Sequence, residues 1–232
     1  MKKIASMFLA AALFSWTASE AQAYPLNPWG SKTATGAVAI NPFLYVYGGP
    51  TLYPYFYGAY GINDKMDVWA GVGAALDGSG GGFGGLEIFP RYFVNENLGL
   101  VAHFFIGTDS IIPSPEVHYV QSWDKFALTV NAGWRPVVGY NGSFAPGTVN
   151  VILAPEYNIS SQLSVFLEVD PVIGLDGSGV ALTLVPGIGF ALDPEQTNTF
   201  AAGFQVAVAP GEFDPATALS FGIWYSRVFG GE

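Results

Sequence analysis

The chain has 232 residues, of which 50% are hydrophobic, 16% are aromatic and only 11% are charged, and its formal net charge is -10. This acidic balance excludes a nucleic-acid-binding protein, because a phosphate backbone is bound by clustered Lys and Arg side chains. The absence of cysteine excludes disulfide bonds, thiolate chemistry and cysteine-ligated metal sites.

The first residues have the layout of a secretory signal peptide. Two lysines precede an apolar stretch over 4–16, and an Ala-Gln-Ala cleavage site ends at Ala23. The apolar stretch is shorter than the roughly 20 residues that a membrane-spanning helix needs. We therefore expect a signal peptide over 1–23, followed by an N-terminal periplasmic extension over 24–34.

The rest of the chain breaks into segments of about ten residues with period-two alternation, separated by turn residues. A chain this apolar, without a spanning helix, can satisfy its backbone in lipid only as a closed barrel. The sequence therefore predicts an all-β protein, a closed antiparallel up-and-down transmembrane β-barrel of about 12 strands over 35–229, with a C-terminal tail over 230–232. The predicted strands are 35–47, 51–62, 66–77, 82–93, 98–107, 115–123, 126–138, 147–158, 163–173, 179–191, 198–209 and 217–229.

The alternation assigns one face of each strand to lipid and the other to the interior. In 66–77 the residues Val68 and Val72 fall on the apolar face, opposite Asp67. In 163–173 the residue Val165 falls on the apolar face and Ser164 on the other. We therefore expect arginine at Val165 or Leu167, near mid-membrane, to cost about 2–4 kcal/mol, and arginine at Ser164 to cost far less. Aromatic residues near the proposed periplasmic strand ends predict a membrane-interface girdle: Tyr60, Tyr92, Trp123, Phe126, Tyr157 and Tyr225.

Sparse polar residues of both charges on the interior phase predict a narrow aqueous path. Glu168 and Asp170 lie two residues apart and point to the same side of the barrel, so they predict a weak preference for cations. Arg135 would neutralise this pair if it reached the two carboxylates. The same residues could instead satisfy one another inside a barrel without a path. The predicted lumen-lining residues are Asp67, Glu87, Arg91, His103, Asn131, Arg135, Asn150, Glu156, Glu168, Asp170 and Gln205.

Catalytic and cofactor sites are not predicted. His103 lies on the interior phase, and pairing across the Asn95–Asn97 turn brings it near Glu87, but no serine is evidently placed as a nucleophile. The Gly-rich run over 78–85 lacks the lysine and the helix of a phosphate-binding loop. Calcium-loop spacing is also absent, so we expect neither a cofactor nor a metal.

Two segments resemble a known group of proteins. Tyr60-Gly-Ile-Asn-Asp-Lys-Met-Asp-Val68 resembles the strand–turn–strand hairpin of small bacterial outer-membrane barrels, including the transporter-like barrels of the phenol meta-cleavage pathway type. The last strand, which ends at Phe229, is similar to the C-terminal assembly signal of such barrels. It departs from that signal at Arg227 and in the three residues that follow Phe229. The resemblance implies a barrel in the outer membrane, but the hairpin motif is structural and brings no binding residues with it.

Together these patterns predict a porin-like channel or transporter in the cell outer membrane of a Gram-negative bacterium, through which small solutes diffuse passively. Its expected partners are outer-membrane lipid, the outer-membrane assembly machinery and a small-molecule solute that the sequence does not identify. The alternatives are a barrel enzyme that acts on lipid and a structural barrel without transport activity. A soluble secreted β-sandwich is less consistent with the Gly- and aromatic-rich second face of the strands.

Overall fold

The structure is a computed structural model that describes residues 32–47, 52–77, 80–193, 197–208 and 219–230. Within these ranges, no helix is long and apolar enough to cross a membrane. The signal peptide predicted over 1–23 and most of the extension predicted over 24–34 lie outside the described residues. The described ranges contain twelve strands: β1 (Val38–Tyr47), β2 (Leu52–Asn63), β3 (Met66–Asp77), β4 (Gly80–Phe93), β5 (Leu98–Ile106), β6 (Ser110–Trp123), β7 (Phe126–Gly139), β8 (Phe144–Ser160), β9 (Leu163–Gly174), β10 (Val180–Ala191), β11 (Asn198–Ala207) and β12 (Leu219–Phe229).

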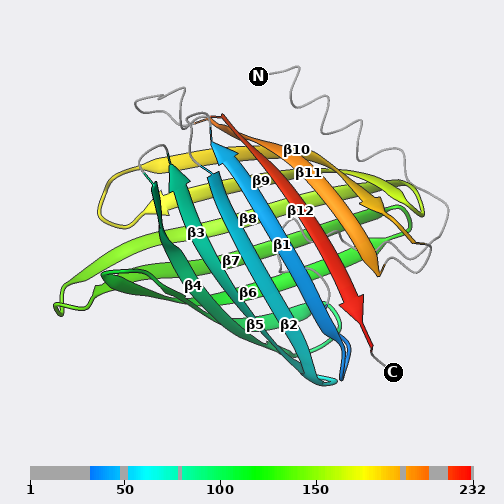
Figure 1. The fold of residues 1–232 in the computed structure, drawn as a ribbon, viewed down its shortest axis with the longest axis horizontal. Helices are drawn as coiled ribbons and strands as arrows, with labels where there is room; N and C mark the ends of the chain where they lie inside the picture. The colour runs from blue at the N-terminus through cyan, green and yellow to red at the C-terminus, as the bar shows by residue number, and fades with distance from the viewer. Residues whose placement is uncertain (1–31, 48–51, 78–79, 194–196, 209–218, 231–232) are drawn as a thin grey trace.

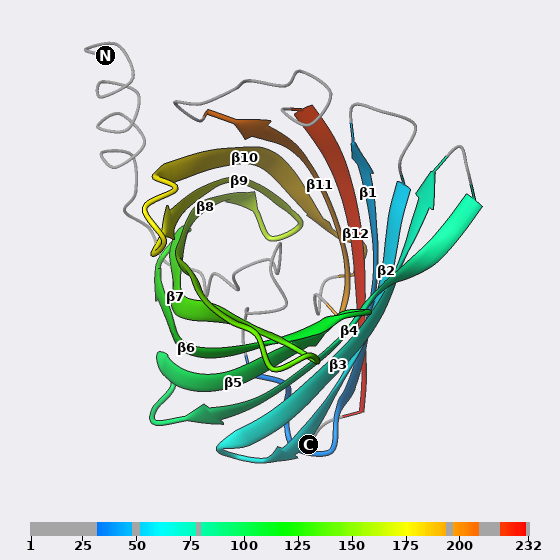
Figure 2. The same ribbon diagram turned by 90° about the vertical axis from the view of Figure 1, so that its left-hand side faces the viewer.

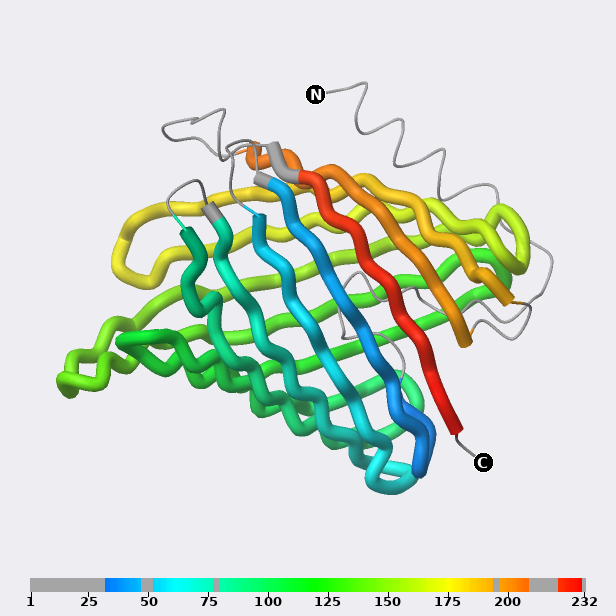
Figure 3. Tube along the Cα trace, in the orientation of Figure 1, coloured from blue at the N-terminus to red at the C-terminus, as the bar shows by residue number. Residues whose placement is uncertain are grey.

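The strands form one closed antiparallel barrel in which each strand pairs with its neighbours in sequence. The barrel closes where β1 and β12 pair, from Val38 opposite Phe229 to Tyr47 opposite Ser220. These two strands lie side by side in Figure 1 and in the trace of Figure 3. The view of Figure 2 shows the strands curving round into a continuous wall. Closure leaves no unpaired sheet edge, and the predicted fold class is confirmed.

The outside of the barrel is apolar. In β3, Val72 is 48% exposed and Leu76 is 42% exposed, whereas the alternating residues Asp67 and Trp69 are buried. This confirms the predicted alternation in β3. Large hydrophobic side chains are exposed on every one of the twelve strands, far more than a soluble monomer leaves in water. The exposed face is therefore the lipid-facing surface of a transmembrane barrel.

Aromatic residues mark one end of this surface. Tyr60, Tyr92 and Trp123 lie at the ends of β2, β4 and β6 that adjoin the short turns, and they are between 43% and 49% exposed. The Trp123 ring stacks on Phe126 across the β6–β7 turn, with 5.7 Å between ring centroids. Amphipathic rings favour the membrane–water boundary, so this end lies at an interface.

Interior aromatic side chains lie over glycines of the neighbouring strand. Tyr57 in β2 pairs with Gly71 in β3, and a methyl group at Gly71 would overlap the tyrosine ring. Phe166 in β9 is placed in the same way over Gly187 in β10. Glycine at these positions lets a large ring lie flat across the next strand, which packs the interior and fixes the strand register.

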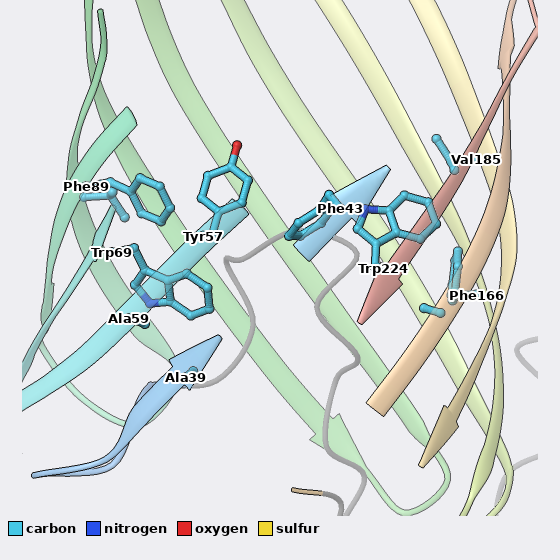
Figure 4. Packing of buried hydrophobic residues seen from close by; sticks show 11 residues of the cluster. Ala39, Phe43, Tyr57, Ala59, Trp69, Phe89, Phe166, Val185 and Trp224 are labelled. Carbon is cyan, nitrogen blue, oxygen red and sulfur yellow. The ribbon is translucent and has the colours of Figure 1, made fainter. Parts of the chain in front are cut away.

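The apolar part of the interior is a cluster of buried residues contributed mainly by β1–β4 and β9–β12. Figure 4 shows Tyr57, Trp69 and Phe89 close together on one side of this cluster and Phe43 beside Trp224 on the other. The rings of Trp69 and Phe89 stack with 5.9 Å between centroids. Such aromatic pairs stabilise the interior by about 0.5–1.5 kcal/mol each beyond burial of their area.

Two hairpins are longer than the sequence predicts. β6 begins at Ser110 rather than 115, and β8 begins at Phe144 rather than 147. Pro113 and Pro115 remain in register with β5. Pro136 is buried at a register shift between Arg135 and Val137. A bulge of this kind accommodates a residue that cannot donate to the ladder.

The residues before β1 pack against the end of the barrel where the two termini of the sheet lie. Gly36 donates a hydrogen bond to the carbonyl oxygen of Gly61 at 2.9 Å, and the backbone N–H of Thr33 donates to Asp67 Oδ2 at 2.8 Å. Lys32 Nζ donates to the carbonyl oxygen of Asp64. Thr35 forms an isolated bridge to Gly61, so β1 begins at Val38 rather than at 35.

Gly61→Ala should detach the 32–37 segment from the barrel without preventing the barrel from forming. A methyl group at Gly61 would overlap the backbone carbonyl of Ala34, which cannot move as a side chain can. Limited proteolysis of the folded protein should then cleave the segment faster than in the wild type. Gly58→Ala is the matched control in β2, because its nearest atom would be 3.9 Å away. Equal protection of the segment in both variants would contradict the proposed docking.

Candidate functional site

The predicted lumen-lining residues occupy buried or half-buried positions on the interior phase of their strands. Asp67, Arg91, His103, Asn131 and Glu156 are buried. The others are partly buried: Glu87, Arg135, Asn150, Glu168, Asp170 and Gln205. Most of the charged members lie on β4–β9, so the interior has a charged wall next to the apolar cluster described above.

Near the end of the barrel that carries the termini, Asp67 and Arg91 form a buried ion pair. Arg91 Nε lies 2.7 Å from Asp67 Oδ1, and Nη2 lies 2.6 Å from Oδ2. Neither side chain is exposed. The guanidinium lies over the rings of Trp69 and Phe93, at 5.3 and 5.2 Å from their centroids. This bidentate pair cancels its own charge and leaves nothing for a solute.

A line of hydrogen bonds crosses the middle of the charged wall from β2 to β6. Tyr57 Oη donates to Glu87 Oε1 at 3.0 Å, passing over Gly71. His103 Nε2 lies 3.0 Å from Glu87 Oε2, and His103 Nδ1 lies 3.1 Å from Glu116 Oε1. Two carboxylate acceptors call for two N–H donors, which the imidazole ring has only in its charged form. The predicted proximity of His103 and Glu87 is confirmed.

This arrangement does not form a serine–histidine pair. Ser114 lies directly opposite His103 in the β5–β6 ladder and is buried. Activation of its hydroxyl requires a ring nitrogen that accepts the proton. Both nitrogens of His103 lie against carboxylates instead. Among the described residues, no group of three or more His, Asp or Glu side chains is arranged to hold a metal ion.

Arg135 is held loosely. Its Nη2 lies 3.7 Å from Glu116 Oε1, which is beyond hydrogen-bonding distance, and its side chain is 34% exposed. Its Nε is buried and has no hydrogen-bond partner among the described residues. Its positive charge also acts on Asp170. One guanidinium is therefore shared between carboxylates of β6 and β9.

Glu168 and Asp170 lie on the same face of β9, as the sequence predicts. Glu168 Oε2 and Asp170 Oδ1 are buried atoms without a hydrogen-bond partner in the described part of the chain. Buried carboxylate oxygens normally have partners, because leaving them unpaired costs free energy. The pair is therefore only partly compensated by Arg135.

Sequence reasoning missed Glu116, His118 and Tyr57 as interior residues. Glu116 and His118 are buried, and His118 Nδ1 lies 2.5 Å from Asn131 Oδ1. The available signal was the alternation of polar residues with less polar neighbours, which indicates an interior face for Ser114, Glu116 and His118. Tyr57 offered no signal, because an aromatic residue fits either face.

Comparison with known proteins supports the architecture. No family model matches the chain, and no curated protein matches its sequence. Among solved structures, the chain is similar to the KdgM porin, with a TM-score of 0.60 and 11% identity over 83% of this chain and 99% of the other. It is also similar to the NanC porin, with a TM-score of 0.58 and 7% identity over 82% and 98%. The COG4313 outer membrane channel from Pseudomonas putida F1 has a TM-score of 0.57 and 13% identity, over 93% of this chain and 100% of the other. The chain thus shares the closed barrel of outer-membrane porins and channels.

Proposed function

We propose that this protein is an outer-membrane channel through which small solutes diffuse passively. The observation that carries the proposal is the partly compensated charge inside a barrel whose outer surface is apolar. Among the described residues the interior contains six carboxylates, two guanidiniums and the imidazole of His103 between two of the carboxylates, and only Asp67 and Arg91 form a bidentate pair. The carboxylates are Asp67, Glu87, Glu116, Glu156, Glu168 and Asp170.

A barrel with a purely structural role would gain nothing from this excess of acid. Removing a carboxylate from water costs several kcal/mol, and the cost is offset only by pairing and hydrogen bonds. Replacing such groups by apolar residues, as in the aromatic cluster, would avoid that cost. Contact with water and with a passing solute gives the acidic residues a function, since rings of side-chain charge set the selectivity of pores.

The sign of the interior charge also bears on the solute. One of the similar structures is described as the KdgM porin in complex with disordered oligogalacturonate, a polyanion. An excess of carboxylates repels a polyanion. We therefore propose that this channel differs from KdgM in its solutes and carries neutral or positively charged compounds.

Conductance in planar lipid bilayers tests the proposal. Protein that fractionates with the outer membrane and is purified in detergent should give discrete current steps. Asn150→Trp, which adds bulk to the interior face of β8, should make the steps several-fold smaller. Leu153→Trp is the matched control in the same strand, because Leu153 is 38% exposed on the lipid side. Absence of current from the correctly folded wild type would refute the channel.

A further inference from the structure

We infer that the interior wall formed by β6, β7 and β9 binds the guanidinium or ammonium group of a solute, and that Arg135 is a tethered competitor for this site. The inference rests on the proposed function, because the solute must enter the barrel interior. It goes further by assigning the solute class and the residues that recognise it. The carboxylates concerned are those of Glu116, Glu168 and Asp170.

Acidic side chains outnumber cationic ones at this place. The carboxyl groups of Glu116, Glu168 and Asp170, together with that of Glu87, face only two cationic side chains among the described residues: Arg135, and His103 between Glu87 and Glu116. The same barrel contains a saturated pair for comparison, in which Arg91 binds Asp67 through two bonds of 2.6 and 2.7 Å. Arg135 has no contact of that kind among the described residues, since its ion pair with Glu116 measures 3.7 Å. Negative charge therefore remains uncompensated at this site and can bind one more cation.

Glu168 and Asp170 also have unused hydrogen-bond acceptors. Glu168 Oε2 and Asp170 Oδ1 are fully buried oxygens without a partner in the described residues. A carboxylate oxygen accepts hydrogen bonds, so the missing partner of each of these two oxygens is a donor. Guanidinium and ammonium groups bring both the donors and the positive charge, and charge-assisted hydrogen bonds are roughly twice as strong as neutral ones.

The end of the barrel opposite the termini is also acidic, independently of the interior. Among the described residues, the segments that join the strands at that end contain two acidic residues and no Lys or Arg. Hydrogen bonds from Ser178 lower the pKa of exposed Asp176, so this carboxylate stays charged at neutral pH. A mouth of one charge raises the local concentration of the opposite ion. The two residues are Asp109 and Asp176.

Arg135 competes with the solute for these interior carboxylates. Because its guanidinium is loosely held and 34% exposed, an incoming cation can displace it without breaking a close ion pair. Its own charge then remains near the site and weakens the binding of the solute. Arg135→Gln should therefore strengthen cation binding, and Glu168→Gln/Asp170→Asn should weaken it.

Guanidinium and urea are the probes, because they have nearly the same shape and differ in charge. In bilayers at low potassium chloride, millimolar guanidinium should reduce the potassium current of the wild type, and urea should not. The half-blocking concentration should fall several-fold in Arg135→Gln and rise several-fold in Glu168→Gln/Asp170→Asn. Glu96→Gln, an exposed acid in the β4–β5 turn at the other end, should leave block unchanged.

Titration calorimetry of the folded protein in detergent tests the site without any current. Guanidinium should give saturable heat with the wild type, more tightly with Arg135→Gln, and none with the double carboxylate variant. If the proteins conduct but guanidinium blocks and binds the variants as it does the wild type, the proposed cation site is wrong and the channel proposal stands. If guanidinium gives saturable heat but the protein passes no current, the channel proposal is wrong and the cation site stands. Absence of both heat and current overturns both proposals.

Discussion

Asp67→Asn should lower the free energy of unfolding by about 3–5 kcal/mol, because it leaves the buried guanidinium of Arg91 without its counter-charge. Both side chains are completely enclosed, so water cannot take over the lost interaction. The same substitution weakens the acceptor for the backbone N–H of Thr33, which holds the 32–37 segment. Urea unfolding of the barrel in detergent micelles, followed by tryptophan fluorescence, measures the change.

The control for this prediction removes both charges together. Asp67→Leu/Arg91→Met has no unpaired buried ion, and replacing a buried ion pair by apolar residues of similar volume is often neutral or stabilising. The double variant should therefore be more stable than Asp67→Asn. A single variant as stable as the wild type would show that the pair contributes no net stability at this position.

Val72→Arg should cost about 2–4 kcal/mol, which is the penalty for arginine on the lipid face at the membrane midplane. Val72 is the seventh of the twelve residues of β3 and is 48% exposed. Its cross-strand neighbour Phe56 is 52% exposed, so the new charge would be surrounded by apolar surface and lipid. Folding titrations of the barrel into lipid vesicles, with wild type and variant compared, give this difference.

Val165→Arg is the depth control. Val165 is also exposed to lipid, at 40%, but it is the third residue of β9 and lies close to the turn. The sequence places Val165 near mid-membrane, whereas its position beside the turn lowers the expected cost from about 2–4 to about 0–1 kcal/mol, because an arginine near the interface reaches water. Equal costs at Val72 and Val165 would mean that the membrane does not centre on the middle of the strands.

The structure also corrects the expected difference between Val165 and Ser164. Ser164 lies on the interior phase, as predicted, and an arginine there was expected to be the milder change. Its exposed fraction is 0%, however, so no space for an arginine side chain remains beside it. Ser164→Arg would overpack the interior, and overpacking typically costs about 1–3 kcal/mol. The sequence predicts that Ser164 faces the interior, but it does not predict how much space lies beside its side chain.

The sequence by itself determined the strands, their faces and one contact between side chains. Period-two alternation places side chains on opposite faces of a strand whatever its neighbours are, so Asp67 and Val72 could be assigned from β3 alone. Short polar turns join antiparallel neighbours in fixed register, which is why the contact between His103 and Glu87 could be predicted across the β4–β5 turn.

Only the tertiary structure decided how the strands of different hairpins face one another. The contact between Arg135 and Glu116 depends on the bulge at Pro136 and on the register of β6 and β7. The enclosure of Ser164 depends on which side chains the closed barrel brings around it. Both properties arise because closing a sheet links the tilt, stagger and interior size of all its strands at once. No single segment of the sequence contains that information.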